Sequence, residues 1–153
     1  MPKIDIDALP AVDGSAYPVP LDAPCRARSR KRLGQAGGLT GFGVNLLTLP
    51  PGAWSSQRHW HSHEDELVFV VEGEVVLITD AGETRLVAGD CATFKAGVAD
   101  GHHLVNRSDR DARLLEVGGR DEQDRTVYSD ADMVAEPGED VYRRRDGSAY
   151  PKG

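Results

Sequence analysis

The stretch Arg58-His59-Trp60-His61-Ser62-His63-Glu64-Asp65-Glu66 runs directly into the apolar segment Leu67-Val68-Phe69-Val70-Val71 and then into Glu72-Gly73. Three imidazoles and three carboxylates therefore lie within eight positions. Histidines two residues apart on a strand point to one face, and imidazole nitrogen and carboxylate oxygen are ligands that first-row divalent metals take where no thiolate is near. The stretch predicts a metal site, with a bend or bulge that brings Glu66 to the side of His59 and His61.

The two remaining histidines of the chain, His102 and His103, are adjacent to each other. A single histidine is more often an ordinary surface or core residue than a metal ligand, so the alternative for each histidine is a role without metal. All five histidines fall in these two clusters, and this grouping favours the metal site.

The spacing of these residues resembles the two sequence motifs of the cupin superfamily. In the first motif, G-x5-H-x-H-x3,4-E-x6-G, the chain matches at His59, His61, Glu66 and Gly73, while Gly52 lies one position too far upstream. The second motif, G-x5-P-x-G-x2-H-x3-N, is matched by Gly89, Gly97, His102 and Asn106, with Lys95 in place of proline and two extra residues before His102. The resemblance covers about residues 39–117.

The resemblance implies an all-β fold, the double-stranded β-helix or jelly-roll barrel of cupins, with the ligands of both motifs inside the barrel. It implies the metal ligands His59, His61, Glu66 and His102, because His102 has the family's spacing to Asn106. If the two extra residues form a bulge, His103 takes the place of His102. Four such donors on a six-coordinate ion leave two positions for water or substrate, and zinc, manganese, iron, nickel and cobalt all accept them.

The region around the motifs is expected to form short strands separated by turns. We expect a hairpin of 74–79 and 83–87 joined by Asp80-Ala81-Gly82, and a strand at 66–71 whose apolar run predicts burial on both faces. Strand patterning alone does not choose among a sandwich, a barrel and a jelly roll, whereas the resemblance does. Further strands are expected at 39–49, 91–94, about 103–106 and 112–117.

The length of 153 residues predicts one domain, with an irregular N-terminal arm at 1–38, a barrel at 39–118 and a C-terminal tail at 119–153. Five of the nine prolines lie in the arm. Residues 119–141 have eight acidic and two basic residues, which predicts a tail that wraps the barrel with little core of its own, pinned by Tyr128 and Tyr142.

Two features of the arms leave alternatives open. Residues 25–32 contain five basic residues, which form either a patch for an anion or partner or a solvated segment. The sequence Asp-Gly-Ser-Ala-Tyr-Pro occurs at 13–18 and again at 146–151, either as turn-forming composition or as matched contacts, for example across a dimer axis.

Charge and composition exclude several classes of function. A net charge of −7 and a pI near 5.2 argue against a nucleic-acid surface, and no segment is long and apolar enough for a membrane span or signal peptide, so we expect a cytoplasmic protein. Cys25 and Cys91 have no metal-binding or disulfide spacing and are expected as reduced thiols. The resemblance and the open sheet edges favour a homodimer.

Two functions fit these observations. The first is a metal-dependent enzyme acting on a small oxygen-rich molecule, of isomerase, dioxygenase or lyase type; the second is a non-catalytic cupin that binds or senses a small ligand. His63, Asp100 and His103 flank the ligands and are candidates for general acid or base, or for supporting contacts. Glu64, Asp65 and Asp100 are expected to accept hydrogen bonds from the second ring nitrogens of the ligand histidines.

Overall fold

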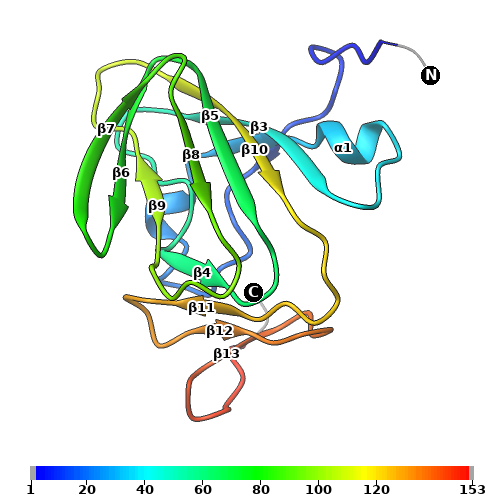
Figure 1. Ribbon diagram of the computed structural model, residues 1–153, viewed down its shortest axis with the longest axis vertical. Coiled ribbons are helices and arrows are strands. Elements are labelled where there is room, and N and C mark those ends of the chain that lie inside the picture. Colours follow the sequence, from blue (N-terminus) through cyan, green and yellow to red (C-terminus); the bar gives the residue numbers. More distant parts are fainter. Residues whose placement is uncertain (1–2, 152–153) are drawn as a thin grey trace.

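Short strands and turns make up most of residues 3–151, the part of the chain that the computed structural model describes (Figure 1). The helical elements are the 3₁₀ turn η1 (Ala23–Cys25) and the single-turn helix α1 (Leu33–Ala36). The strands are β1 (Val12–Asp13), β2 (Ser29–Lys31), β3 (Gly43–Leu49), β4 (His59–His61), β5 (Glu66–Glu72), β6 (Glu74–Thr79), β7 (Gly82–Val87), β8 (Cys91–Phe94), β9 (His103–Val105), β10 (Ala112–Gly118), β11 (Thr126–Tyr128), β12 (Val134–Ala135) and β13 (Tyr142–Arg143).

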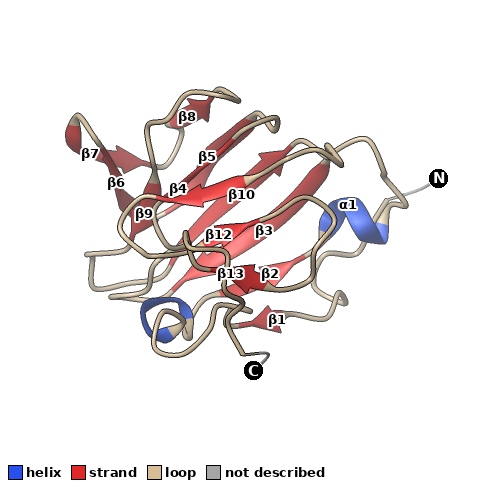
Figure 2. Cartoon of the chain, turned by 90° about the horizontal axis from the view of Figure 1, so that it is seen from below, coloured by secondary structure: helices blue, strands red, loops and turns tan. Residues whose placement is uncertain are grey.

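One wall of the molecule is a six-stranded sheet in the order β1-β2-β3-β10-β5-β8. Its longest strands, β3, β10 and β5, are antiparallel neighbours and lie side by side in Figure 2. The register places Gly43 of β3 opposite Gly118 of β10, and Gly118 opposite Glu66 of β5. These three residues therefore form one row across the sheet, and their side-chain positions share one face.

The opposite wall consists of two smaller sheets, β7-β6-β9 and β13-β12-β11-β4. A single antiparallel bridge between His59 and His102 connects them, with the amide of each residue donating to the carbonyl of the other at 3.1 and 2.9 Å. The two motifs are joined through this bridge. Antiparallel walls with this strand order confirm the predicted jelly-roll architecture.

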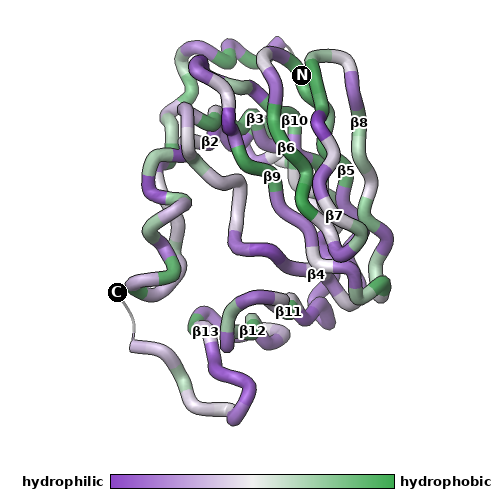
Figure 3. The backbone as a smooth tube through the Cα atoms, turned by 90° about the vertical axis from the view of Figure 1, so that its left-hand side faces the viewer, coloured by the Kyte–Doolittle hydropathy of each residue, from purple (hydrophilic) through white to green (hydrophobic). Residues whose placement is uncertain are grey.

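The main hydrophobic core lies between the two walls, where alternate residues of each strand point inward. Figure 3 shows apolar residues in green along these strands and hydrophilic residues in purple along the segment after β13. The buried core residues are Leu47, Leu49, Ala53, Val68, Val70, Val75, Leu86, Leu104, Ala112 and Leu114.

The predicted burial of strand 66–71 on both faces is wrong. Phe69 is 38% exposed and Val71 is 44% exposed, whereas Val68 and Val70 are buried. The strand lies in a wall rather than between two layers, so only every second residue reaches the core. Both cysteines are free, as predicted, with Cys25 buried and Cys91 exposed.

The arm and the tail pack against each other and form a second hydrophobic cluster, so the expectation of little core in the tail is wrong. Tyr128, Ala131 and Met133 of the tail are buried there. Tyr17 of the arm meets Tyr128 edge to face with ring centroids 5.5 Å apart, and Tyr142 also packs on this cluster. The prediction that Tyr128 and Tyr142 pin the tail is confirmed.

The repeated segments at the two ends of the chain have matching roles. Gly14 and Gly147 both adopt positive φ, as expected for turn-forming composition. Tyr17 and Tyr150 both pack on the second cluster, and each has an arginine over its ring, Arg28 and Arg144 respectively. The matched contacts are made within one chain. Among residues 3–151, no helix is long and apolar enough to cross a membrane.

Gly73, in the turn from β5 to β6, combines a left-handed backbone with a close backbone neighbour. Its φ is +78°, and a Cβ there would lie 2.8 Å from the carbonyl oxygen of Asp111. We expect Gly73→Ala to lower the free energy of unfolding by about 3 kcal/mol, from left-handed strain and a backbone clash. Urea denaturation measures this effect. Gly52→Ala, at φ +82° with open space around it, is the matched control and should cost only about 1 kcal/mol. Equal losses in the two variants would contradict the clash.

Candidate metal centre

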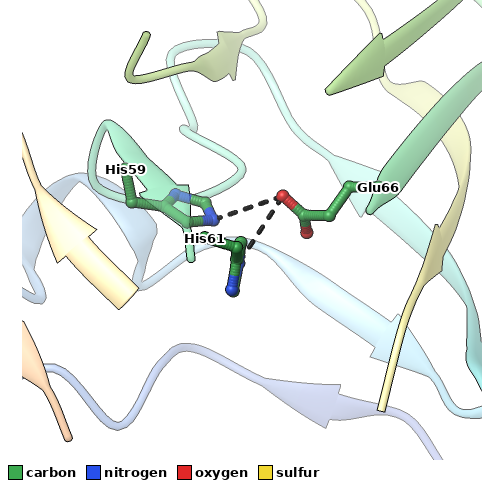
Figure 4. A group of neighbouring side chains, drawn as sticks. All are labelled: His59, His61 and Glu66. Atoms are coloured by element: carbon green, nitrogen blue, oxygen red, sulfur yellow. Dashed lines mark ion pairs between the residues drawn. The ribbon is translucent and has the colours of Figure 1, made fainter. Parts of the chain in front are cut away.

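Strand β4 and the start of β5 bring the residues of the first motif together from opposite walls. His59 and His61 are two residues apart on β4. This strand pairs with β11, with His59 opposite Tyr128 and His61 opposite Thr126. Their rings share one side, with centroids 5.0 Å apart. The chain then turns through residues 62–65 and enters the other wall, so Glu66 faces the two imidazoles (Figure 4). The bend predicted between His61 and Glu66 is present.

His102 joins this group from the second motif through its backbone bridge to His59. The residue before it, Gly101, is buried under the tail: a Cβ there would lie only 1.9 Å from Oγ of Ser129. Arg58 also fixes the chain at Gly101. It donates to the Gly101 carbonyl at 3.2 Å and forms ion pairs with Asp80 and Asp130. The glycine therefore allows the tail to close against the strand that presents His102.

Three imidazole nitrogens converge on one carboxylate oxygen. The distances from Oε2 of Glu66 to Nε2 are 2.9 Å for His102, 3.5 Å for His61 and 3.7 Å for His59 (Figure 4 shows the last two). Ligand atoms that share an ion at about 2.1 Å lie roughly 3 to 3.5 Å from one another, so these separations suit a divalent metal. His59, His61 and Glu66 also form a compact group in which one ligand atom of each lies within 4.8 Å of the others.

Hydrogen bonds at Nδ1 direct the Nε2 lone pairs of two histidines toward this point. Nδ1 of His59 donates to the carbonyl of Gln57 at 2.8 Å, and Nδ1 of His61 donates to Oδ2 of Asp124 at 2.6 Å. With the proton held on Nδ1, Nε2 carries a lone pair that faces Glu66. Two acceptors that face a carboxylate oxygen repel it unless a cation lies between them, so the group has the electrostatics of a metal site.

Burial and mutual contact set the charges of this group. Burial lowers the pKa of His59 to about 4, so the ring is neutral at neutral pH. Burial alone would raise the pKa of Glu66, but the hydrogen bond from His102 opposes it, and the pKa lies at about 2. His59 and Glu66 therefore present a neutral imidazole beside an ionised carboxylate, the forms that bind a divalent ion.

His102 is held differently from the other two imidazoles. Its ring stacks on Phe94 with centroids 3.5 Å apart and an interplanar angle of 1°. Nδ1 of His102 is buried and has no hydrogen-bond partner within residues 3–151. Only Nε2 therefore faces a polar neighbour, and that neighbour is Glu66.

The three predicted acid–base candidates lie in different places. His63 is exposed and hydrogen-bonds to Oγ of Ser62. His103 points away from the group: its ring packs edge-on against Trp54, and Nδ1 binds the carbonyl of Ser56 at 3.1 Å. Asp100 lines a cavity with the cluster, and its Oδ1 accepts the amide of Asp80.

The expected partners of the ligand histidines are wrong. Glu64, Asp65 and Asp100 accept backbone amides of Asp121, Ala96 and Asp80 respectively, and the carboxylate at His61 is Asp124 of the tail. Asp124 also accepts the amide of His63 at 2.8 Å, and with the bond from His61 this outweighs the effect of burial and lowers its pKa. Asp124 follows β10, outside the barrel strands, and only the folded tail brings it next to His61.

Two cavities meet at the cluster. The larger, of about 430 Å³, is lined by His59, Glu66 and His102 and by four arginines, Arg28, Arg30, Arg32 and Arg120. The smaller, of about 240 Å³, is lined by His61, Glu66, His102, Trp60, Phe94, Lys95 and Asp100, among others. Glu64 lines both. The larger cavity falls within the usual range of small-molecule sites, about 300–1,000 Å³.

Comparison with known proteins agrees with this geometry. A family model described as Cupin domain matches residues 45–118. The crystal structure of a sugar phosphate isomerase from a cupin superfamily of Silicibacter pomeroyi is 47% identical, with a TM-score of 0.92, over 98% of this chain and 97% of that chain. The chain belongs to the cupin superfamily.

Two further solved structures are less similar to this chain. A proposed sugar phosphate isomerase from Acidithiobacillus ferrooxidans is 28% identical with a TM-score of 0.68, over 81% of this chain and 74% of that chain. A predicted oxalate decarboxylase from Thermotoga maritima, at 23% identity and a TM-score of 0.53 over 60% and 79% of the two chains, shows the fold alone. No curated protein matches the sequence.

Sequence reasoning missed the polar residues that this cupin draws from its arms. Asp124 has no spacing signal, because it is one of several acidic residues in the tail. The arginines did have a spacing signal. Arg28, Arg30 and Arg32 are two residues apart, which on a strand places them on one face. The basic segment was expected to be either a patch or solvated, and the structure shows that Arg28, Arg30 and Arg32 line the larger cavity.

Asp124→Asn should weaken metal binding by about 10- to 100-fold, because the amide can no longer hold the proton on Nδ1 of His61. Competition with a chromophoric chelator, with Zn²⁺ or Mn²⁺ as the probe, measures the change. Asp121→Asn is the control, since Asp121 lies in the same tail and its carboxylate accepts only the nearby amide of Gln123. Unchanged affinity in Asp124→Asn would show that this contact does not orient a ligand.

Proposed function

We propose that this cupin is a metal-dependent isomerase of a sugar or sugar phosphate, with the ion held by His59, His61, Glu66 and His102. The observation that supports this most directly is the convergence of three Nε2 atoms on one oxygen of Glu66 beside a polar cavity. The relative at 47% identity, which matches nearly the whole chain, is a sugar phosphate isomerase. Bound in this group, a divalent ion would polarise a carbonyl or hydroxyl oxygen of the substrate as a Lewis acid.

The residues around the larger cavity suit a hydroxylated ligand. Its lining includes Asn45, Ser55 and Ser56, whose amide and hydroxyl groups can exchange hydrogen bonds with sugar hydroxyls. Arg30 forms a two-point ion pair with Glu116, at 2.7 and 2.8 Å, which holds that carboxylate in place on the cavity wall. Both walls contribute to the lining, since Asn45 and Glu116 belong to the six-stranded sheet and His59 to the opposite wall.

Isomerisation moves a proton between neighbouring carbons of the substrate, and two carboxylates are placed for this step. Glu64 lines both cavities, and its Oε1 is held by the amide of Asp121, which leaves Oε2 to move a proton. Asp100, predicted from the sequence, lines only the smaller cavity. We therefore propose Glu64 as the principal acid–base group and Asp100 as a secondary one, while exposed His63 and His103 behind the cluster lie outside both cavities.

The ligand assignment predicts which histidines matter. His61→Ala and His102→Gln should each lower metal affinity by about 100-fold or more, beyond the usual effect of a supporting residue, because each loses a direct donor. His63→Ala and His103→Gln should keep the parent's metal content. Elemental analysis of the four variants, prepared without chelator, tests this. If His103→Gln loses more bound metal than His102→Gln, then His103 is the ligand and His102 is not.

Aldose–ketose interconversion by the metal-loaded protein, followed by proton NMR over a panel of sugars and sugar phosphates, tests the activity. Glu64→Gln should lower kcat by about 10²- to 10⁴-fold with metal content unchanged, because it removes a proton carrier and keeps the shape of the side chain. Asp100→Asn serves as the comparison and should lose less. If Asp100→Asn alone loses activity, the role belongs to Asp100. Ligand binding without turnover would instead support the alternative of a non-catalytic sensing cupin.

The homodimer and the cytoplasmic location predicted from the sequence remain predictions. Exposed Phe69 and Val71 on the outer face of β5, next to edge strand β8, are the apolar surface that a second copy would cover.

A further inference from the structure

The basic segment of the N-terminal arm forms a stripe of arginines along the larger cavity. Strand β2 pairs with β3, so Arg28, Arg30 and Arg32 share one face, while Lys31 points the other way and donates to the carbonyls of Ile6 and Asp7. Arg28 is 6% exposed and is bound to the carbonyls of Gly14 and Ser55. Arg30 is neutralised by Glu116. These two guanidinium groups therefore have structural partners.

Arg32 and Arg120 differ from every other arginine of the chain. Within residues 3–151, they are the two arginines whose guanidinium groups make neither a hydrogen bond nor an ion pair, whereas the guanidinium groups of all the others do. Both line the cavity that also contains His59, Glu66 and His102. Two unpaired guanidinium groups thus face one cavity from segments far apart in the sequence.

The sheet places these arginines on the cavity face, near the row that contains Glu66. A Cβ on Gly43 would lie 2.9 Å from Nη2 and 3.3 Å from Cζ of Arg120, so the guanidinium group lies over the bare backbone of Gly43. Gly43 is in line with Gly118 and Glu66 across β10. Arg32 follows β2 directly, where the register continues to Asn45, two residues along β3 from Gly43. With about 4.8 Å between strands, Gly43 and Glu66 are about 10 Å apart.

We propose that Arg32 and Arg120 form a phosphate subsite of the larger cavity, which binds the phosphate group of a sugar phosphate while the other end of the sugar lies at the His/Glu cluster. This inference rests on the proposed function for the reaction, and it adds the residues that select a phosphorylated substrate. A guanidinium group matches two phosphate oxygens at once, and two of them suit a dianion. A sugar phosphate of about five carbons, with bonds of ~1.5 Å, covers most of the 10 Å between the two ends.

The charge of the cavity agrees with this assignment. The whole chain has a net charge of −7, yet the cavity lining combines four arginines with three carboxylates, Glu64, Glu66 and Glu116. A bound divalent ion would make the lining more positive still. The acidic surface outside disfavours nonspecific binding of polyanions, whereas the cavity favours a small anion.

The test compares glucose 6-phosphate, glucose and glucuronate as probes, by calorimetry on the metal-loaded full chain. The parent should prefer glucose 6-phosphate to glucose, and Arg32→Gln or Arg120→Gln should each weaken glucose 6-phosphate binding by about tenfold, with glucose binding and metal content unchanged. Gly43→Ala should produce the same selective loss, because the added Cβ displaces the Arg120 guanidinium group without requiring an unusual φ. Arg110→Gln, at an exposed arginine outside this cavity, is the control.

The outcomes separate this proposal from the proposed function. If the parent has no preference for the phosphorylated sugar, or if Arg32→Gln/Arg120→Gln retains the preference, the subsite is overturned even where turnover is observed. Tighter binding of glucuronate than of glucose 6-phosphate also overturns it, in favour of a carboxylate. A phosphate preference that disappears in the double variant supports the subsite, and if no isomerisation accompanies it, only the isomerase proposal fails.

Discussion

The half-buried carboxylate of Glu66 is the constraint on which the rest of this structure depends. An ionised group inside a barrel is unfavourable unless charge or hydrogen bonds compensate it, and here the hydrogen bond from His102 compensates it, while His59 and His61 direct acceptors toward it from 3.7 and 3.5 Å. Both walls must be in place for this contact, because Glu66 starts a strand of one wall and the histidines belong to the other. The backbone bridge between His59 and His102 keeps the two motifs in register.

The arms complete a site that the barrel strands alone leave unfinished. The family match covers residues 45–118, but Asp124, which orients His61, and the arginines of the larger cavity lie outside that range. The same two segments meet in the second hydrophobic cluster, where Tyr17 packs on Tyr128. Tyr128 also pairs with His59 across β11 and β4, so the packing of the arms supports the strand that presents the histidines.

Glycine has a specific role at the points where segments approach closely around the site. Gly101 allows Ser129 to pack directly on the backbone next to His102. Gly118 leaves the inner face of the sheet open next to the Glu66 side chain. Gly43, in the same row, leaves room for Arg120. Larger residues in this row would fill the cavity with side chains, so the small residues create the space in which a ligand can meet the cluster.

The sequence by itself determined the hairpin of β6 and β7, strand β8 and the grouping of His59, His61 and Glu66, because strand alternation and motif spacing are local properties. It required His102 and His103 to face opposite sides, as neighbours on a strand do, but left open which of them joins the group, and the structure places His102 there. Only the tertiary structure decided that Asp124 holds His61 and that Arg32 and Arg120 face the cluster. These contacts join segments that are dozens of residues apart, and no local periodicity encodes which distant side chain a folded sheet brings to a given row.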